Sequence, residues 1–183
     1  MRLYHITTKS NAEKILAEGF KIKTFDDRNI RFWGNGLYFS DNYNIGEWLR
    51  VLEHDIFTSD SHPVKIEVEI PDNLKLLKLH SDAYEKKNLT EESEEFFKWV
   101  HENKATILPE IEKIIDKSSI YANQEALGYF AEKYCRLKGY DGIEHKRYGD
   151  YKRHKSQKYL LSYEVVVYNP EVIKPIKIHN IEY

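Results

Sequence analysis

The sequence VKIEVEI, residues 64–70, alternates apolar and charged side chains at every position and is followed by Pro71. A period of two is typical of a strand with one face buried and the other in water. Further segments of β-forming residues lie before and after it, at 3–6, 37–39, 141–144, 160–168 and 172–178. We therefore expect a sheet that begins near residue 3 and is rejoined by the last strands of the chain.

The segments between these strands predict helices. A capping box at Ser10 and Glu13 and a stop at Gly19 indicate a short helix after the first strand. Further helices are expected over 42–54, 90–103, 107–116 and 123–137, the last with an apolar face of Leu127, Phe130, Ala131, Tyr134 and Leu137. Together these elements predict an α+β fold in one domain, residues 1–183, with a helical insertion at about 85–137.

The composition indicates a folded protein outside the membrane. Of the 183 residues, 41% are hydrophobic, which is enough for a core, and 32% are charged. No stretch approaches the roughly 18 consecutive apolar residues of a membrane helix, and the first residues lack the apolar segment of a signal peptide, so we expect a cytoplasmic location. Cys135 is the only cysteine, which excludes an intramolecular disulfide and a zinc site made of several thiolates.

Three short segments place a chemically useful side chain on or beside an expected strand. LYHIT at 3–7 contains His5, GLYFS at 36–40 contains Tyr38, and YEVVVYNP at 163–170 contains Glu164. Taken singly, each has an ordinary structural interpretation: a histidine at a strand end, a core tyrosine and a solvent-facing glutamate. Their combination and order indicate a functional site.

In this order the three segments resemble the His-Tyr-Glu ADP-ribosyltransferases, the superfamily that contains diphtheria toxin and the poly(ADP-ribose) polymerases. Residues 11–20, 138–143 and 169–170 fit the same pattern, so the resemblance covers most of the chain except about 72–122. It implies a split antiparallel β-sheet core and transfer of ADP-ribose from NAD+ without a metal. The opening YHIT, with Ile6 where many members have Gly, is similar to that of DNA-modifying toxins of this superfamily.

The resemblance assigns three catalytic residues. Glu164 would hydrogen-bond the nicotinamide ribose and stabilise the oxocarbenium ion that develops as the glycosidic bond breaks. His5 would hydrogen-bond a ribose hydroxyl, and Tyr38 would stack on the cationic nicotinamide ring.

Other NAD+-binding residues are expected close to these three. The backbone of Ile6 would bind the carboxamide, and Thr7 beside it belongs to the same site. Many members have a second stacking tyrosine further along the chain, whereas this sequence has Leu49 at that position. Trp48 could supply the ring instead, or it could be a core residue of its helix.

In this family the segment before the catalytic glutamate faces the acceptor, and here that segment is basic. Residues 146–158 carry a net charge of +5, although the whole chain carries −2. Its cations suit phosphates and its tyrosines suit unstacked bases, which favours single-stranded RNA or DNA as the acceptor. The candidate acceptor-binding residues in this expected hairpin loop are Lys146, Arg147, Tyr148, Tyr151, Lys152, Arg153 and Lys155. By the same resemblance, the protein would be the toxin of a toxin–antitoxin or phage-defence system.

Other interpretations of these features remain open. The same site could modify a protein side chain, with the basic segment against an acidic surface, or it could hydrolyse NAD+. The fold could also bind nucleic acid or a partner without catalysis, and the basic loop could simply be solvated. The acidic segment 85–116, with a net charge of −4, could be a solvated face or the docking site of an antitoxin.

Overall fold

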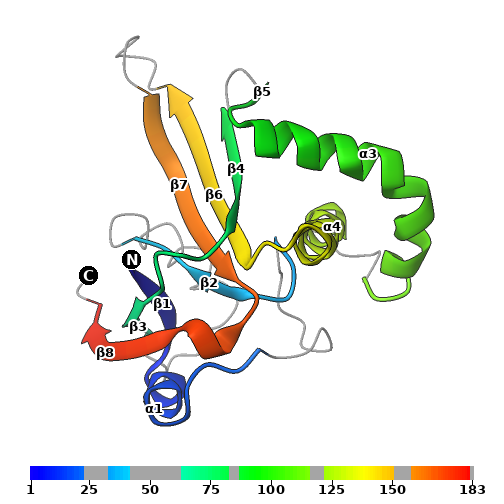
Figure 1. Cartoon of the computed structure of the whole chain (residues 1–183). Coiled ribbons are helices and arrows are strands. Elements are labelled where there is room, and N and C mark those ends of the chain that lie inside the picture. The colour runs from blue at the N-terminus through cyan, green and yellow to red at the C-terminus, as the bar shows by residue number, and fades with distance from the viewer. Residues whose placement is uncertain (23–32, 42–62, 83–86, 116–121, 151–157, 182–183) are drawn as a thin grey trace.

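The computed structural model describes residues 1–22, 33–41, 63–82, 87–115, 122–150 and 158–181. Its strands form two sheets (Figure 1). The first sheet has the order β1 (Arg2–Thr8), β3 (Pro63–Glu69), β8 (Lys174–Asn180), and every pair is antiparallel. The second has the order β2 (Leu37–Phe39), β7 (Lys158–Val167), β6 (Gly142–Asp150), β4 (Leu76–Asp82), β5 (Lys87–Asn88).

The mixed class of helices and strands predicted from the sequence is confirmed, but a purely antiparallel core is not. Strands β4 and β6 pair in parallel, from Leu76 opposite Gly142 to Asp82 opposite Tyr148. No strand is predicted from the sequence at β4 or β5. A parallel neighbour needs a long connection, and here that connection contains the helices of the insertion.

The alternating segment forms β3, as predicted, and it is the central strand of the first sheet. Ile66 and Val68 are fully buried, and β1 and β8 flank them on either side. The expectation that the last strands rejoin the sheet begun near residue 3 is confirmed for β8 alone, because β6 and β7 belong to the second sheet. The strand predicted at 172–178 begins later, because Pro170–Val172 form a short 3-10 turn, η1, before β8.

Helix α1 (Lys9–Glu18) begins two residues earlier than the capping box predicted. The N-cap is Thr8, whose hydroxyl accepts a hydrogen bond from the backbone N–H of Asn11, so Ser10 lies inside the helix. The predicted stop at Gly19 is confirmed, with φ of 79° and its N–H donating to the carbonyl of Ile15.

One long helix replaces the two predicted at 90–103 and 107–116. Helix α3 (Glu91–Ile111) runs through Pro109, and its buried residues Phe96, Ile107 and Ile111 pack in one core. That shared packing outweighs the proline, which removes a single intrahelical donor near the helix end. Helix α4 (Ala122–Lys138) matches its prediction, except that Leu137 is 65% exposed.

Two apolar clusters hold the molecule together, one on each face of β7. Val166 points into the helix-side core, between the second sheet and helices α3 and α4. Val165 and Val167 point into the sheet-side core, which the first sheet and α1 complete. Figure 1 shows α3 and α4 beside the long ribbon of β7, β6 and β4, with the first sheet toward the lower end of that ribbon. No helix in the described part of the chain is long and apolar enough to cross a membrane.

Candidate active site

The two sheets meet at Ser40. Its backbone exchanges two hydrogen bonds with Tyr4 of β1, of 2.8 and 3.0 Å, and its hydroxyl donates to the carbonyl of Tyr163 on β7 at 2.7 Å. Tyr4 and Ser40 form an isolated bridge, so β1 and β2 touch there and then diverge. Tyr4 and Tyr163, the two partners of Ser40, are each followed along the chain by a predicted site residue, His5 and Glu164.

His5 takes the place of the next backbone hydrogen bond between the sheets. Continuing the register from Tyr4 and Ser40 would place Ile6 opposite Tyr38, but the bridge at Tyr4 and Ser40 is isolated and does not extend into a ladder. Instead, Nδ1 of His5 lies 2.9 Å from the Tyr38 carbonyl oxygen. Because a carbonyl only accepts, the proton of a neutral His5 lies on Nδ1 and Nε2 keeps its lone pair. The ring packs edge-on against Phe20, with 5.4 Å between ring centroids.

The environment of His5 favours its neutral form. Burial lowers the pKa of His5, and the hydrogen bond to the Tyr38 carbonyl offsets this only in part. A neutral imidazole with a bare Nε2 can accept a hydrogen bond from a hydroxyl without changing its charge. This is the behaviour required of a residue that positions a ribose.

The backbone of Ile6 faces the point where the sheets diverge. Successive peptide groups of a strand point to opposite sides, so the N–H and C=O of Ile6 point in the same direction as those of Tyr4, away from β3. Such a donor and acceptor pair is complementary to a primary carboxamide. Thr7 is the next residue of β1 and pairs with Val64, so its own backbone faces β3.

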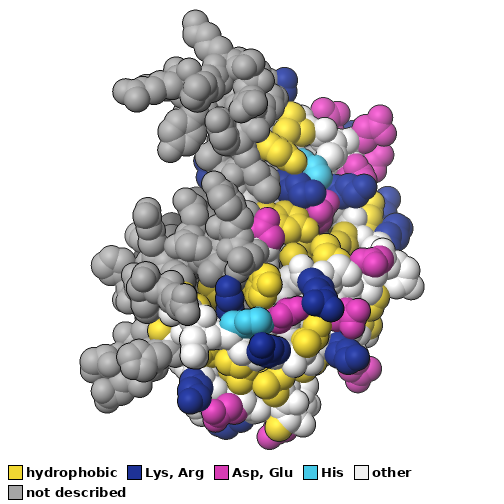
Figure 2. All heavy atoms as spheres, turned by 90° about the vertical axis from the view of Figure 1, so that its left-hand side faces the viewer, with side chains coloured by type: hydrophobic (Ala, Val, Ile, Leu, Met, Phe, Trp, Pro, Cys, Tyr) yellow, Lys and Arg dark blue, Asp and Glu magenta, His cyan; other side chains and the backbone are white. Residues whose placement is uncertain are grey.

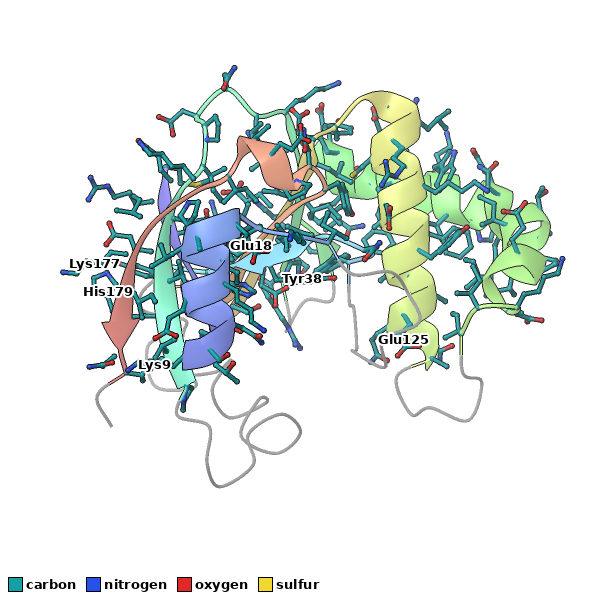
Figure 3. The ribbon with its side chains drawn as sticks, turned by 90° about the horizontal axis from the view of Figure 1, so that it is seen from below. Lys9, Glu18, Tyr38, Glu125, Lys177 and His179 are labelled. Carbon is teal, nitrogen blue, oxygen red and sulfur yellow. The ribbon has the colours of Figure 1, made fainter. Side chains whose placement is uncertain are left out.

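The Tyr38 hydroxyl shapes the turn before β2. It donates to the carbonyl of Gly34 at 2.8 Å and accepts from the backbone N–H of Trp33 at 2.9 Å. Helix α4 holds the same turn from the other side, because the Glu132 carboxylate accepts the N–H of Asn35 at 2.8 Å. Figure 3 shows Tyr38 on β2, with α1 on one side and α4 on the other. The helical insertion thus contributes directly to the geometry of this turn.

The same turn also positions Glu164. Trp33 is 9% exposed, and its carbonyl accepts the Tyr168 hydroxyl at 2.7 Å. Its indole Nε1 donates to Oε2 of Glu164 at 3.0 Å. Tyr38 and Glu164 share one face of the second sheet, because Tyr38 lies opposite Val166 and Glu164 is two residues from Val166. Glu164 is therefore a held, 13% exposed carboxylate, not the solvent-facing strand residue of the alternative interpretation.

His145 is a third group beside this carboxylate. It lies opposite Glu164 in the pairing of β6 and β7, and its Nδ1 is 3.7 Å from Oε2. Its ring centroid is 4.7 Å from that of Trp33. Sequence reasoning missed both Trp33 and His145. Their spacing from Glu164 along the chain gives no signal, and only the strand register and the turn bring them together.

At its described residues the basic segment is strand and not the predicted loop. Lys146, Arg147 and Tyr148 belong to β6, because its pairing with β7 continues to Asp150 opposite Lys158. The other four candidates, Tyr151, Lys152, Arg153 and Lys155, lie outside the described residues, as does Trp48.

The three described candidates point to opposite faces of β6. Arg147 is exposed and lies opposite Ser162, two residues from Glu164, so it shares the face of the Glu164 carboxylate. Lys146 and Tyr148 point to the other face. There, the Lys146 ammonium is 2.8 Å from Glu144, and the Tyr148 ring lies against His80.

Glu144 organises this second face. Burial alone would raise the pKa of Glu144, but contacts with Lys146 and with His80, whose Nε2 is 3.2 Å away, lower it overall. The Lys146 ammonium on this face is thus paired with a carboxylate. Figure 2 shows the same mixture of positive and negative side chains on the described part of the surface that faces its viewer. Within the described ranges, no group of three or more His, Cys, Asp or Glu residues is placed to hold a metal ion.

Comparison of the chain with protein-family models, with curated proteins and with solved structures finds no match.

Proposed function

We propose that this protein is an NAD+-dependent ADP-ribosyltransferase whose catalytic carboxylate is Glu164. The observation that carries the proposal is a chain of contacts at one sheet junction, beside the outward-facing backbone of Ile6: His5 Nδ1 to the Tyr38 carbonyl, the Tyr38 hydroxyl to the Trp33 N–H, and the Trp33 indole to Glu164. The resemblance of the three sequence segments to His-Tyr-Glu enzymes points to the same residues.

The chemistry follows from the charges that develop during the reaction. The bond between C1′ of the ribose and the nicotinamide nitrogen breaks, and nicotinamide leaves neutral with the electron pair. The ribose then carries the positive charge, which a fixed, desolvated carboxylate stabilises more strongly than water does. The acceptor attacks C1′, and its proton passes to Glu164 or to solvent. His5 and Ile6 supply positioning, which lowers the entropic part of the barrier.

We propose a nucleic acid as the acceptor, in the setting of a toxin–antitoxin or phage-defence system. Arg147 supports this choice, because it is an exposed cation on the same face as Glu164. A guanidinium binds phosphate in a bidentate manner and also stacks on bases. The target base has to be unstacked for attack, which favours single-stranded RNA or DNA.

The test incubates the protein with labelled NAD+ and separate pools of single-stranded RNA, single-stranded DNA, duplex DNA and cell protein. Glu164→Gln should abolish transfer and nicotinamide release while NAD+ still binds. Glu144→Gln is the matched control, since Glu144 is a carboxylate of similar exposure on the neighbouring strand and on the opposite face. Equal turnover by wild type and Glu164→Gln would refute the proposal.

The pool that is labelled decides between acceptors. Label on RNA or DNA supports the nucleic-acid acceptor. Label on protein alone would support ADP-ribosyl transfer but refute a nucleic acid as the acceptor. Release of nicotinamide without label on any pool would identify an NAD+ glycohydrolase.

A further inference from the structure

Glu164 is approached by two side chains on the same oxygen. Trp33 Nε1 donates to Oε2 at 3.0 Å, and His145 Nδ1 lies 3.7 Å from that same atom. The His145 and Trp33 rings are in contact, inclined by 42° with their centroids 4.7 Å apart. Oε1, the second oxygen of Glu164, has no hydrogen-bond partner among the described residues.

We propose that His145 is a positioning residue that donates its Nδ1 proton to Oε2 of Glu164, so that Trp33 and His145 fix one carboxylate oxygen and leave Oε1 for the substrate. This inference rests on the proposed role of Glu164 as the catalytic carboxylate. It extends that role by assigning the two oxygens different tasks.

The burial of His145 Nδ1 is the first argument. The atom is shielded from solvent and makes no hydrogen bond, which is a costly state for a ring nitrogen. The side chain that it faces is a carboxylate, which can only accept. A bare lone pair on Nδ1 would be repelled by Oε2, whereas an N–H there would be attracted. The proton therefore belongs on Nδ1.

The capacity of Oε2 is the second argument. A carboxylate oxygen has two lone pairs, and Trp33 uses one of them, so a second donor can be accepted. At 3.7 Å the two atoms are too far apart for a hydrogen bond, and an approach of about 0.8 Å would bring them to the usual N–H···O distance. The strand pairing places the two residues directly opposite each other, so we expect a side-chain rotation, without a change of strand register, to close this distance.

Two substitutions separate this role from simple packing. His145→Phe keeps a ring against Trp33 but has no donor, whereas His145→Asn loses the ring but places an amide N–H near the position of Nδ1. The donor role predicts that His145→Phe lowers kcat for nicotinamide release by roughly 10- to 100-fold with KM for NAD+ nearly unchanged, because misplacement of a catalytic group costs about this much. His145→Asn should retain most of the rate. The reverse order of the two variants would overturn the proposal.

A measurement that needs no activity completes the test. Nitrogen-15 NMR of the histidine side chains, at a pH where His145 is neutral, reports which ring nitrogen carries the proton. A proton on Nδ1 is expected, and a proton on Nε2 with a bare Nδ1 would refute the inference. If the wild type releases no nicotinamide, the proposed function fails on its own, and the NMR result still decides the geometry at His145.

Discussion

The hydrogen bond from Trp33 to Glu164 gives the sharpest prediction for the proposed site. Trp33→Phe keeps an aromatic ring in the helix-side core but removes the indole N–H that holds Oε2. The carboxylate is only 13% exposed, so water cannot fully replace that donor. We therefore expect Trp33→Phe to lower the free energy of unfolding and to misplace the Glu164 carboxylate.

The size of the effect can be estimated from the kind of bond. A hydrogen bond to a carboxylate contributes about 1.5–3 kcal/mol, and the missing five-membered ring adds a packing loss of about 1 kcal/mol or more. Trp99→Phe removes the same ring from a partly buried tryptophan of the same core whose indole makes no hydrogen bond with the described residues. The difference between the two variants isolates the bond at about 2 kcal/mol, or about 4–8 °C in Tm for a chain of this length.

Urea denaturation of both variants, alone and combined with Glu164→Ala, is the appropriate assay. In the double-mutant cycle of Trp33 and Glu164, the coupling free energy should be about 1.5–3 kcal/mol, whereas the cycle of Trp99 and Glu164 should give about zero. A cost of Trp33→Phe that is the same with and without the Glu164 side chain would refute the reasoning.

Three further predictions test other parts of the structure. Arg147→Ala should weaken binding of single-stranded RNA and reduce the salt slope of log Kd by about 0.7, whereas Lys146→Ala should leave both nearly unchanged in fluorescence anisotropy; equal losses would contradict the assignment of the two faces. Because burial lowers the pKa of His5 from 6.5, the unfolded chain binds more protons than the folded one, and the free energy of unfolding should fall as the pH drops below about 6.5. In urea titrations between about pH 8 and pH 5, His5→Gln should reduce that fall. An unchanged pH dependence in this variant would contradict the burial of a neutral His5. Gly142→Ala should destabilise the fold by about 3 kcal/mol in the same assay, because a Cβ would overlap a β7 carbonyl, and a normal midpoint would be inconsistent with the β6–β7 register.

The sequence was sufficient where one local rule acts alone. The alternation of residues 64–70 gave β3, and the left-handed glycine at Gly19 gave the end of α1. It failed where tertiary contacts decide the outcome. Thr8 and Ser10 are both acceptable N-caps, and the choice of Thr8 depends on where β1 stops pairing with β3. The continuation of α3 through Pro109 likewise depends on the core that Ile107 and Ile111 enter together.

The candidate site divides in the same way. His5, Tyr38 and Glu164 carry chemistry that is visible in their own segments, so their order along the chain was enough to propose them. Trp33 and His145 are linked to the candidate site only by their contacts with Glu164, and nothing in their local sequence distinguishes them from core residues. Sequence reasoning also treated residues 146–148 as one basic patch, because charge counts do not show which face of a strand each side chain takes.

The position of Glu164 along β7 explains why these neighbours matter. On its face of the sheet the next residue along β7 is Val166, which is fully buried, and the previous one is Ser162, beside the exposed Arg147. Glu164 thus lies where an apolar core gives way to a polar surface within two residue spacings. A carboxylate there is dry enough for its charge to act strongly on a developing cation, yet it costs desolvation energy that a donor such as Trp33 has to offset. In the proposed reaction NAD+ would bind at the junction beside His5 and Ile6, and the acceptor would bind on the side of Arg147. The ribose of NAD+ and the acceptor would then reach Glu164 from different directions.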